Sequence, residues 1–148
     1  MEINGLPLHA LAVHGAVVFG PLATLVGLAY VIPALRDRLR WPLVVTVAVA
    51  LGSIWTAYLS GEQVQEANQY GGELAALVET HEERAEVLRL LVSGLAAASF
   101  VAAWQHARGG PVRVVLAVLV AGLAIATGIW TVLTGDAGAQ IAWFGING

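Results

Sequence analysis

The sequence predicts an all-α membrane protein, a four-transmembrane-helix bundle with up-down-up-down topology. Two observations predict it. The first is a set of four apolar stretches with almost no charge, residues 10–34, 43–60, 87–104 and 112–133. A helix of about 20 apolar residues crosses the roughly 30 Å hydrocarbon layer, and only a helix satisfies its backbone polar groups within one such segment. The second is the sorting of charge between the connections, in which arginines and glutamates occupy different loops.

The composition supports one integral membrane domain over residues 1–148. The chain is 58% hydrophobic and 11% charged, with a mean hydropathy of +0.77, whereas soluble domains are about 45–50% apolar and about 25% charged. The net charge of −3, with seven arginines and no lysine, argues against nucleic acid as a partner. The absence of cysteine excludes disulfides, thiolate metal sites, cysteine-ligated iron–sulfur clusters and covalently attached haem.

The first two helices are expected over residues 10–34 and 43–60, with Pro33 and Pro42 stopping helices on either side of the connection between them. The N-terminus lacks the basic region and cleavage site of a secretory signal, so the first stretch should persist as a helix. No soluble domain is expected at either end. Glycine and alanine recur on one stripe of the first helix and on the fourth, and they predict close helix packing: Gly20, Ala23, Gly27, Gly122 and Gly128.

The third helix is expected to run from about residue 72 to 106. Its first half, ELAALVETHEERAEVLRLL, has helix-forming composition and reaches the third apolar stretch without glycine or proline. Its first turns should therefore stand out of the membrane, after a short polar piece that ends in Gly71 and Gly72. The fourth helix, residues 112–133, should follow a tight turn, and the closing glycine-rich segment should lie on the external surface.

The charge sorting predicts the orientation. Arginines in short loops stay in the cytoplasm, and five of the seven lie in or beside the first and third connections: Arg36, Arg38, Arg40, Arg108 and Arg113. The second connection is acidic. Both termini and this acidic connection should therefore face the external or periplasmic side of the membrane.

Four histidines are the main candidates for chemistry, because ionisable groups near a bilayer are costly. His9, His14 and His81 lie toward the external side, and His106 lies at the cytoplasmic end of the third helix. The 25 residues between His81 and His106 correspond to roughly 37 Å of helix, so the two cannot share a ligand. This excludes two stacked haems that each have two histidine ligands. His106 is interpreted as an interfacial residue that extends to water.

The three external histidines could bind one haem b through two imidazoles, or a zinc or copper ion with a carboxylate from Glu62, Glu82 or Asp136. Depth in the membrane distinguishes the possible pairs of histidine ligands. His14 is expected at a level about 15 Å from that of His81, whereas His9 is expected closer to the level of His81. His14 also sits opposite the Gly20 stripe unless Pro21 rotates the first helix. Alternatively, the histidines are hydrogen-bonded structural residues.

Other activities have little support. The chain contains no G-x-G-x-x-G after a strand, no Walker loop, no H-E-x-x-H and no G-x-S-x-G, so hydrolysis and nucleophilic catalysis are not indicated, and whether the protein is an enzyme stays open. A charged transport path would need ionisable groups near the bilayer centre, where the sequence offers only serines and threonines.

Several segments resemble domain-of-unknown-function family 2231, an uncharacterised family of bacterial membrane domains. They are Leu6–His14, similar to a His-Pro-Leu-x-Val-His-Phe-Pro opening, Gly61–Glu62, Val78–Glu82 and Thr134–Gly138. Ala10, Gly15–Ala16 and Phe144 depart from the family pattern. The resemblance implies a multi-pass protein of the bacterial inner membrane. Because some members are joined to Rieske or cytochrome-like modules, it also implies a setting of electron transfer.

These observations favour a small integral membrane protein that serves a membrane redox system, with a haem or metal held near the external face by His9, His14 and His81, or with a non-catalytic role next to such a centre. The alternative is a structural or assembly subunit of a larger membrane complex, and a small transporter is a third, weaker hypothesis. The expected partners are the lipid bilayer and either other membrane subunits or further copies of this chain.

Overall fold

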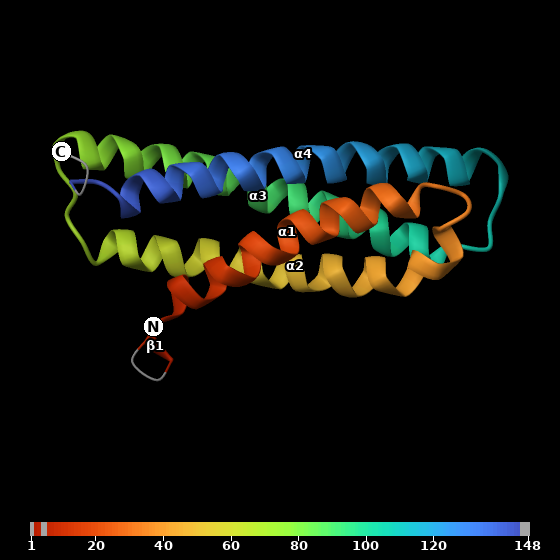
Figure 1. The fold of residues 1–148 in the computed structure, drawn as a ribbon, viewed down its shortest axis with the longest axis horizontal. Coiled ribbons are helices and arrows are strands. Elements are labelled where there is room, and N and C mark those ends of the chain that lie inside the picture. Colours follow the sequence, from red (N-terminus) through yellow and green to blue (C-terminus); the bar gives the residue numbers. More distant parts are fainter. Residues whose placement is uncertain (1, 4–5, 146–148) are drawn as a thin grey trace.

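The four-helix architecture is confirmed in the computed structural model, which describes residues 2–3 and 6–145 (Figure 1). Two short strands, β1 (Glu2–Ile3) and β2 (Leu6–Pro7), pair in antiparallel fashion ahead of the bundle. The helices are α1 (Leu8–Tyr30), α2 (Arg36–Glu66), α3 (Gly72–Trp104) and α4 (Gly110–Ala142). All four are long and apolar enough to cross a membrane. The protein is thus a multi-pass membrane protein.

Each helix packs against its neighbours in sequence, and α1 also packs against α4, so α1 and α3 lie diagonally across the bundle (Figure 1). One end of the bundle contains the α1–α2 and α3–α4 connections and five of the seven arginines, and we call it the arginine end. The opposite end contains the α2–α3 connection, the start of α1 and the end of α4. We call it the carboxylate end, because nearly all the acidic residues lie there.

Burial follows the pattern of a membrane bundle. The interior is rich in alanine and small polar side chains, including buried Ser99, Thr127 and Thr131. Large apolar side chains cover the outside instead, and exposed examples come from every helix: Leu25, Val45, Leu90, Val118 and Val132. This distribution suits a lipid environment, because lipid tails accept apolar side chains.

Glycines bring α1 and α4 together, as the sequence predicted for Gly20, Gly27 and Gly128. A methyl group added at Gly20 would lie 2.9 Å from the Thr131 side chain, and one at Gly128 would lie 2.9 Å from the Thr24 side chain. Thr24 donates to the carbonyl oxygen of Ala124 across this contact at 3.1 Å. The prediction for Gly122 is wrong, because Gly122 is exposed and a methyl group added there would have no atom of another helix within 4 Å.

The first connection is shorter than expected. α1 ends at Tyr30, before residue 34, and α2 begins at Arg36, so Arg36, Arg38 and Arg40 belong to its first turns. Pro42, expected to stop a helix, lies inside α2. The carbonyl left free by its missing N–H belongs to Arg38, which is exposed, and membrane helices tolerate proline where freed groups find other partners.

The two even-numbered helices extend beyond the predicted ends at the carboxylate end. α2 continues to Glu66 past residue 60, and α4 continues to Ala142 past residue 133, so the closing segment is largely helical. α3 begins at Gly72 as expected and ends at Trp104, two residues before the predicted end. Helices of 31–33 residues measure about 46–50 Å, well beyond a hydrocarbon layer of about 30 Å. Their polar ends at the carboxylate end therefore extend beyond the lipid core.

Candidate functional site

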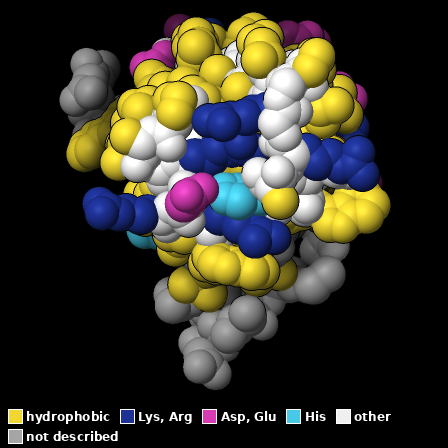
Figure 2. Space-filling model, turned by 90° about the vertical axis from the view of Figure 1, so that its right-hand side faces the viewer, with side chains coloured by type: hydrophobic (Ala, Val, Ile, Leu, Met, Phe, Trp, Pro, Cys, Tyr) yellow, Lys and Arg dark blue, Asp and Glu magenta, His cyan; other side chains and the backbone are white. Residues whose placement is uncertain are grey.

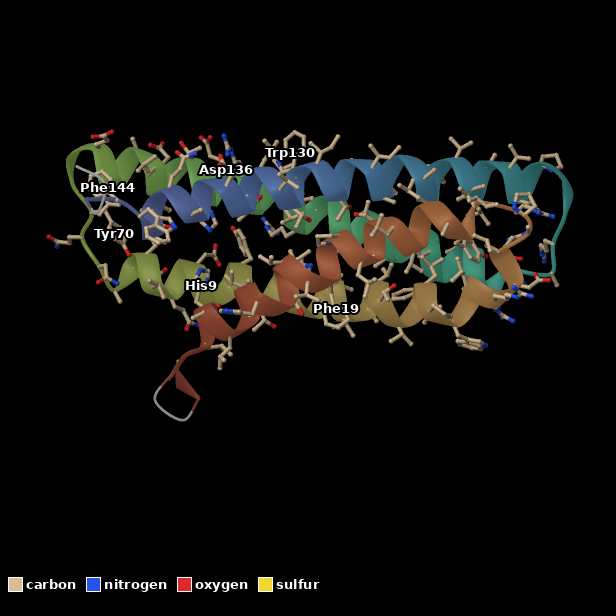
Figure 3. The ribbon with its side chains drawn as sticks, viewed as in Figure 1. His9, Phe19, Tyr70, Trp130, Asp136 and Phe144 are labelled. Atoms are coloured by element: carbon tan, nitrogen blue, oxygen red, sulfur yellow. The ribbon has the colours of Figure 1, made fainter. Side chains whose placement is uncertain are left out.

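His9 is fixed near the start of α1 by the neighbouring helix α2 (Figure 3). Its Nδ1 lies 2.9 Å from the carbonyl oxygen of Ala57. The imidazole also packs against Gly61, where a methyl group would lie 3.1 Å from the His9 Cε1 atom. The ring is half-buried. Gly61 therefore gives this imidazole the space to reach a backbone carbonyl of α2.

His81 is fixed in the same way between α3 and α4. Its Nδ1 lies 3.0 Å from the carbonyl oxygen of Thr134, and a methyl group at Gly138 would lie 3.1 Å from the His81 Cε1 atom. In both cases an imidazole of one helix reaches a carbonyl of the next helix, and a glycine four residues beyond that carbonyl accommodates the ring. The two halves of the bundle thus repeat one arrangement.

The hydrogen bonds define which nitrogen of each ring is available. A carbonyl oxygen only accepts, so the Nδ1 atoms of His9 and His81 carry the hydrogen and donate it. In a neutral imidazole, Nε2 then keeps a free lone pair. Histidines that bind metal centres commonly have this arrangement, in which the nitrogen that does not bind is held by a carbonyl or carboxylate.

The surroundings of His81 keep its ring neutral. His81 precedes the apolar part of α3, which starts at residue 87, and lies in the polar half of that helix. Burial lowers the pKa of His81 from its ordinary value, the hydrogen bond to Thr134 acts in the opposite direction, and the nearby charges of His9 and Arg84 lower it further.

The other predicted ligands are placed differently. His14 lies on the exposed face of α1, where its Nδ1 is 2.6 Å from the carbonyl oxygen of Ala10 in its own helix, so this nitrogen makes no contact with a neighbouring helix. Glu82 accepts a hydrogen bond of 2.8 Å from Gln65, and Asp136 lies 3.7 Å from Arg84 (Figure 3). Glu62 follows Gly61 on α2. Within residues 8–145, no three histidine, aspartate or glutamate side chains are grouped as a metal ion would require.

No protein-family model, curated protein or solved structure matches this chain. The resemblance to family 2231 therefore stays a prediction.

A second polar cluster, at the arginine end, was missed by the sequence analysis. The His106 ring lies between Tyr30 and Asp37, with Nδ1 3.2 Å from the Tyr30 hydroxyl and Nε2 2.9 Å from a carboxylate oxygen of Asp37. Tyr30 also donates to the carbonyl oxygen of Ala102 at 3.1 Å and accepts from Nε of Arg36 at 3.4 Å. His106 is thus part of a cluster that joins α1, α2 and the C-terminal end of α3. The one sequence signal for this cluster is the grouping of arginines around the first and third connections.

Proposed function

We propose that this protein serves a membrane redox system, with His9 and His81 as the residues that would hold a haem b near the carboxylate end. The matching arrangement of these two residues carries the proposal. Each imidazole donates from Nδ1 to a carbonyl of the next helix, which leaves Nε2 free to bind iron. The bound haem would supply one-electron transfer, and the chain would hold and orient it.

Haem b fits the described residues better than a zinc or copper ion does. Two imidazoles are enough for a haem iron, whereas a zinc site needs three or four protein ligands, and no third ligand joins the pair within residues 8–145. The hydroxyl of Thr134, the residue whose carbonyl oxygen accepts from His81, is buried and has no hydrogen-bond partner among the described residues. Such an unused donor suits a site whose polar partner is a bound group.

Membership of family 2231 forms part of the proposal. The segments that carry the resemblance contain His9, Gly61, His81, Thr134 and Gly138. His9 contacts Gly61, and His81 contacts Thr134 and Gly138. The protein would then be a bacterial inner-membrane protein, with both termini and the carboxylate end on the external side, because the five arginines lie at the other end. Other membrane subunits, or further copies of this chain, would be its partners.

A structural or assembly role is the second candidate, and the same hydrogen bonds favour it. His9 joins α1 to α2, and His81 joins α3 to α4. Two such contacts could stabilise the polar end of the bundle without any cofactor. The two candidate functions differ at the Nε2 atoms of His9 and His81, which would bind iron in the redox role and have no ligand in the structural role.

An absorbance spectrum separates the two roles. The protein is purified in mild detergent from membranes of a host supplied with a haem precursor, and haem and metals are measured per chain. We expect a Soret band that is lost in His9→Ala and in His81→Ala but kept in His14→Ala, the matched control on the exposed face of α1. A colourless, metal-free wild-type protein that does not take up added haem would leave the structural role.

A further inference from the structure

The two halves of the bundle, α1–α2 and α3–α4, have the same construction. α1 packs more extensively against α2 than against α4, and α3 packs more extensively against α4 than against α2. Each half is therefore a two-helix unit. Both units begin and end at the carboxylate end, so they run in the same direction across the membrane (Figure 1).

The buried positions of α1 recur in α3 at one constant interval. His9 and His81 are separated by the same 72 residues as Tyr30 and Ala102. All four buried residues of α1 have buried counterparts at this interval, because α1 buries Gly20, Ala23, Gly27 and Tyr30, and α3 buries Val92, Leu95, Ser99 and Ala102 among others. We call residues related in this way equivalent.

The buried positions of α2 recur in α4 at a second constant interval. α2 buries Leu43, Val47, Ala50, Ile54 and Ser60, and α4 buries their equivalents Val120, Ala124, Thr127, Thr131 and Ala137. The whole succession of buried, half-buried and exposed residues over 41–54 recurs over 118–131, except at Thr46 and Val49.

The histidine contacts follow the same two intervals. Ala57 is equivalent to Thr134, and Gly61 is equivalent to Gly138, so the carbonyl and the glycine that hold His9 correspond to those that hold His81. The period of a helix alone would align two buried faces at several intervals. The histidine contacts select the same interval as the buried residues, so the two units share one register.

Contacts in the middle of the bundle show how the units are related. In an assembly with a twofold axis, residues beside the axis meet their own equivalents. Tyr30 donates to the carbonyl oxygen of its equivalent, Ala102, at 3.1 Å. A methyl group at Gly27 would lie 3.7 Å from Val120 and 4.0 Å from Leu43, which are equivalent to each other. Such an axis therefore runs along the bundle between the units.

The arginine end follows the same relation. Arg36 lies in the first turn of α2, and its equivalent Arg113 lies in the first turn of α4. Figure 2 looks along the bundle onto this end and shows arginine side chains around a histidine and an acidic side chain. Both units thus contribute to the positive charge from which the orientation was predicted.

We infer that the bundle is an internal dimer, in which two equivalent two-helix units are related by a twofold axis along the membrane normal. Repeats with an axis in this direction are one established architecture of membrane proteins. The surface between the units is then isologous, so each contact of α1 with α4 has a counterpart between α3 and α2. The partner that the surface of each unit fits is a second unit of the same kind.

The axis also bears on the proposed haem b site, and this consequence rests on the proposed function. Because His9 and His81 are equivalent, they lie at the same level on opposite sides of the axis. Each unit would therefore contribute one imidazole to a group held on the axis.

Cysteine cross-linking in the full chain tests the axis, because the chain has no cysteine of its own. Gly27→Cys with Ala124→Cys joins α1 to α4, where a methyl group at Gly27 would lie 3.1 Å from the Ala124 Cβ atom. Ser99→Cys with Val47→Cys is the equivalent pair between α3 and α2. The matched control combines Ser99→Cys with Ala48→Cys, an exposed position beside Val47. Disulfide formation is followed on denaturing gels after mild oxidation of membranes that contain each variant.

A second set of pairs serves in case Gly27→Cys prevents folding. Thr24→Cys with Gly128→Cys joins α1 to α4, where a methyl group at Gly128 would lie 3.4 Å from the Thr24 Cβ atom. Its equivalent pair is Ala96→Cys with Leu51→Cys, between α3 and α2.

We expect each pair and its equivalent to form a disulfide at similar rates. The control pair should be at least about tenfold slower, because side chains on different faces of a helix do not bring their Cβ atoms into disulfide range. Cross-links between α1 and α4 without their equivalents between α3 and α2 would overturn the axis, as would a control pair that reacts as fast as Ser99→Cys with Val47→Cys. Failure of both α1–α4 pairs would overturn the surface between the units.

The outcome is independent of any cofactor. Equivalent cross-links in a protein that takes up no haem would support the internal dimer and contradict only the proposed function. A haem-binding protein without equivalent cross-links would keep the proposed function and overturn the internal dimer.

Discussion

At the scale of the residue, the contacts of His9 and His81 depend on the absence of a side chain at one position each. Gly61 and Gly138 let the rings approach the helix backbone closely enough to reach the carbonyl oxygens of Ala57 and Thr134. Glycine inside a helix costs about 1 kcal/mol relative to alanine. Gly138 therefore lowers the stability of α4 relative to alanine, and the close approach of the His81 ring explains why a glycine stands there.

The first prediction concerns this glycine. Gly138→Ala should push the His81 ring by a few tenths of an ångström and weaken its 3.0 Å hydrogen bond, because the new methyl group would lie 3.1 Å from Cε1. The control is Gly135→Ala on the same helix, where nothing lies within 4 Å. Gly138→Ala should unfold in detergent with a free energy about 1 kcal/mol lower than Gly135→Ala. Equal stability of the two variants would show that the ring is not confined.

The second prediction is a pH dependence at His81. Because burial lowers the pKa of His81 in the folded protein, the unfolded chain takes up this proton more readily as the pH falls below about 6.5. Stability should therefore decrease as the pH falls from 7 toward 5, and His81→Gln should reduce that decrease. Thermal unfolding in detergent at several pH values measures both. A pH profile of stability that is the same in His81→Gln as in the unchanged protein would contradict the attribution of this pH dependence to His81.

At the scale of the element, hydropathy predicts the number of helices, because lipid imposes the helix on each apolar stretch. The start of α3 is predicted instead by the helix-forming residues that follow Gly71 and Gly72. It does not predict the ends of α2 and α4. The glycines at 135 and 138 suggested a surface segment, yet Thr134 and Ala137 are buried and the helix continues. The carbonyl partners of His9 and His81 have no signature in the sequence, since any residue supplies a carbonyl. Tyr30 and His106 meet across 76 positions, a separation that no local pattern reveals.

Tyr30 allows a third prediction, about how the helices are joined at the arginine end. Tyr30→Phe keeps the ring but removes the hydroxyl that contacts Ala102, His106 and Arg36. The free energy of unfolding should fall by about 1–3 kcal/mol, because buried Arg36 loses its acceptor. Tyr70→Phe, in the α2–α3 connection, is the control, and its unfolding midpoint should stay close to that of the unchanged protein. A Tyr30→Phe protein as stable as this control would mean that the cluster contributes nothing to the bundle.

At the scale of the whole molecule, the two ends of the bundle have opposite character. The arginine end contains five of the seven arginines, and the carboxylate end contains nearly all the acidic residues together with His9 and His81. Because the chain has no cysteine, a single introduced cysteine reports topology without background. Arg38→Cys should resist a membrane-impermeant maleimide in intact cells, and Gln69→Cys should react. The reverse result would place the histidine pair on the cytoplasmic side.

The pairing of His9 and His81 on one haem iron is tested most directly by the spin state of the protein saturated with haem. Electron paramagnetic resonance of the oxidised protein should show a low-spin iron at one haem per chain, since two imidazole ligands give that state. His9→Ala and His81→Ala should each convert the signal to high spin, while His14→Ala leaves it unchanged. A low-spin signal that survives in either of the first two variants, or no stoichiometric haem at all, would contradict the pairing.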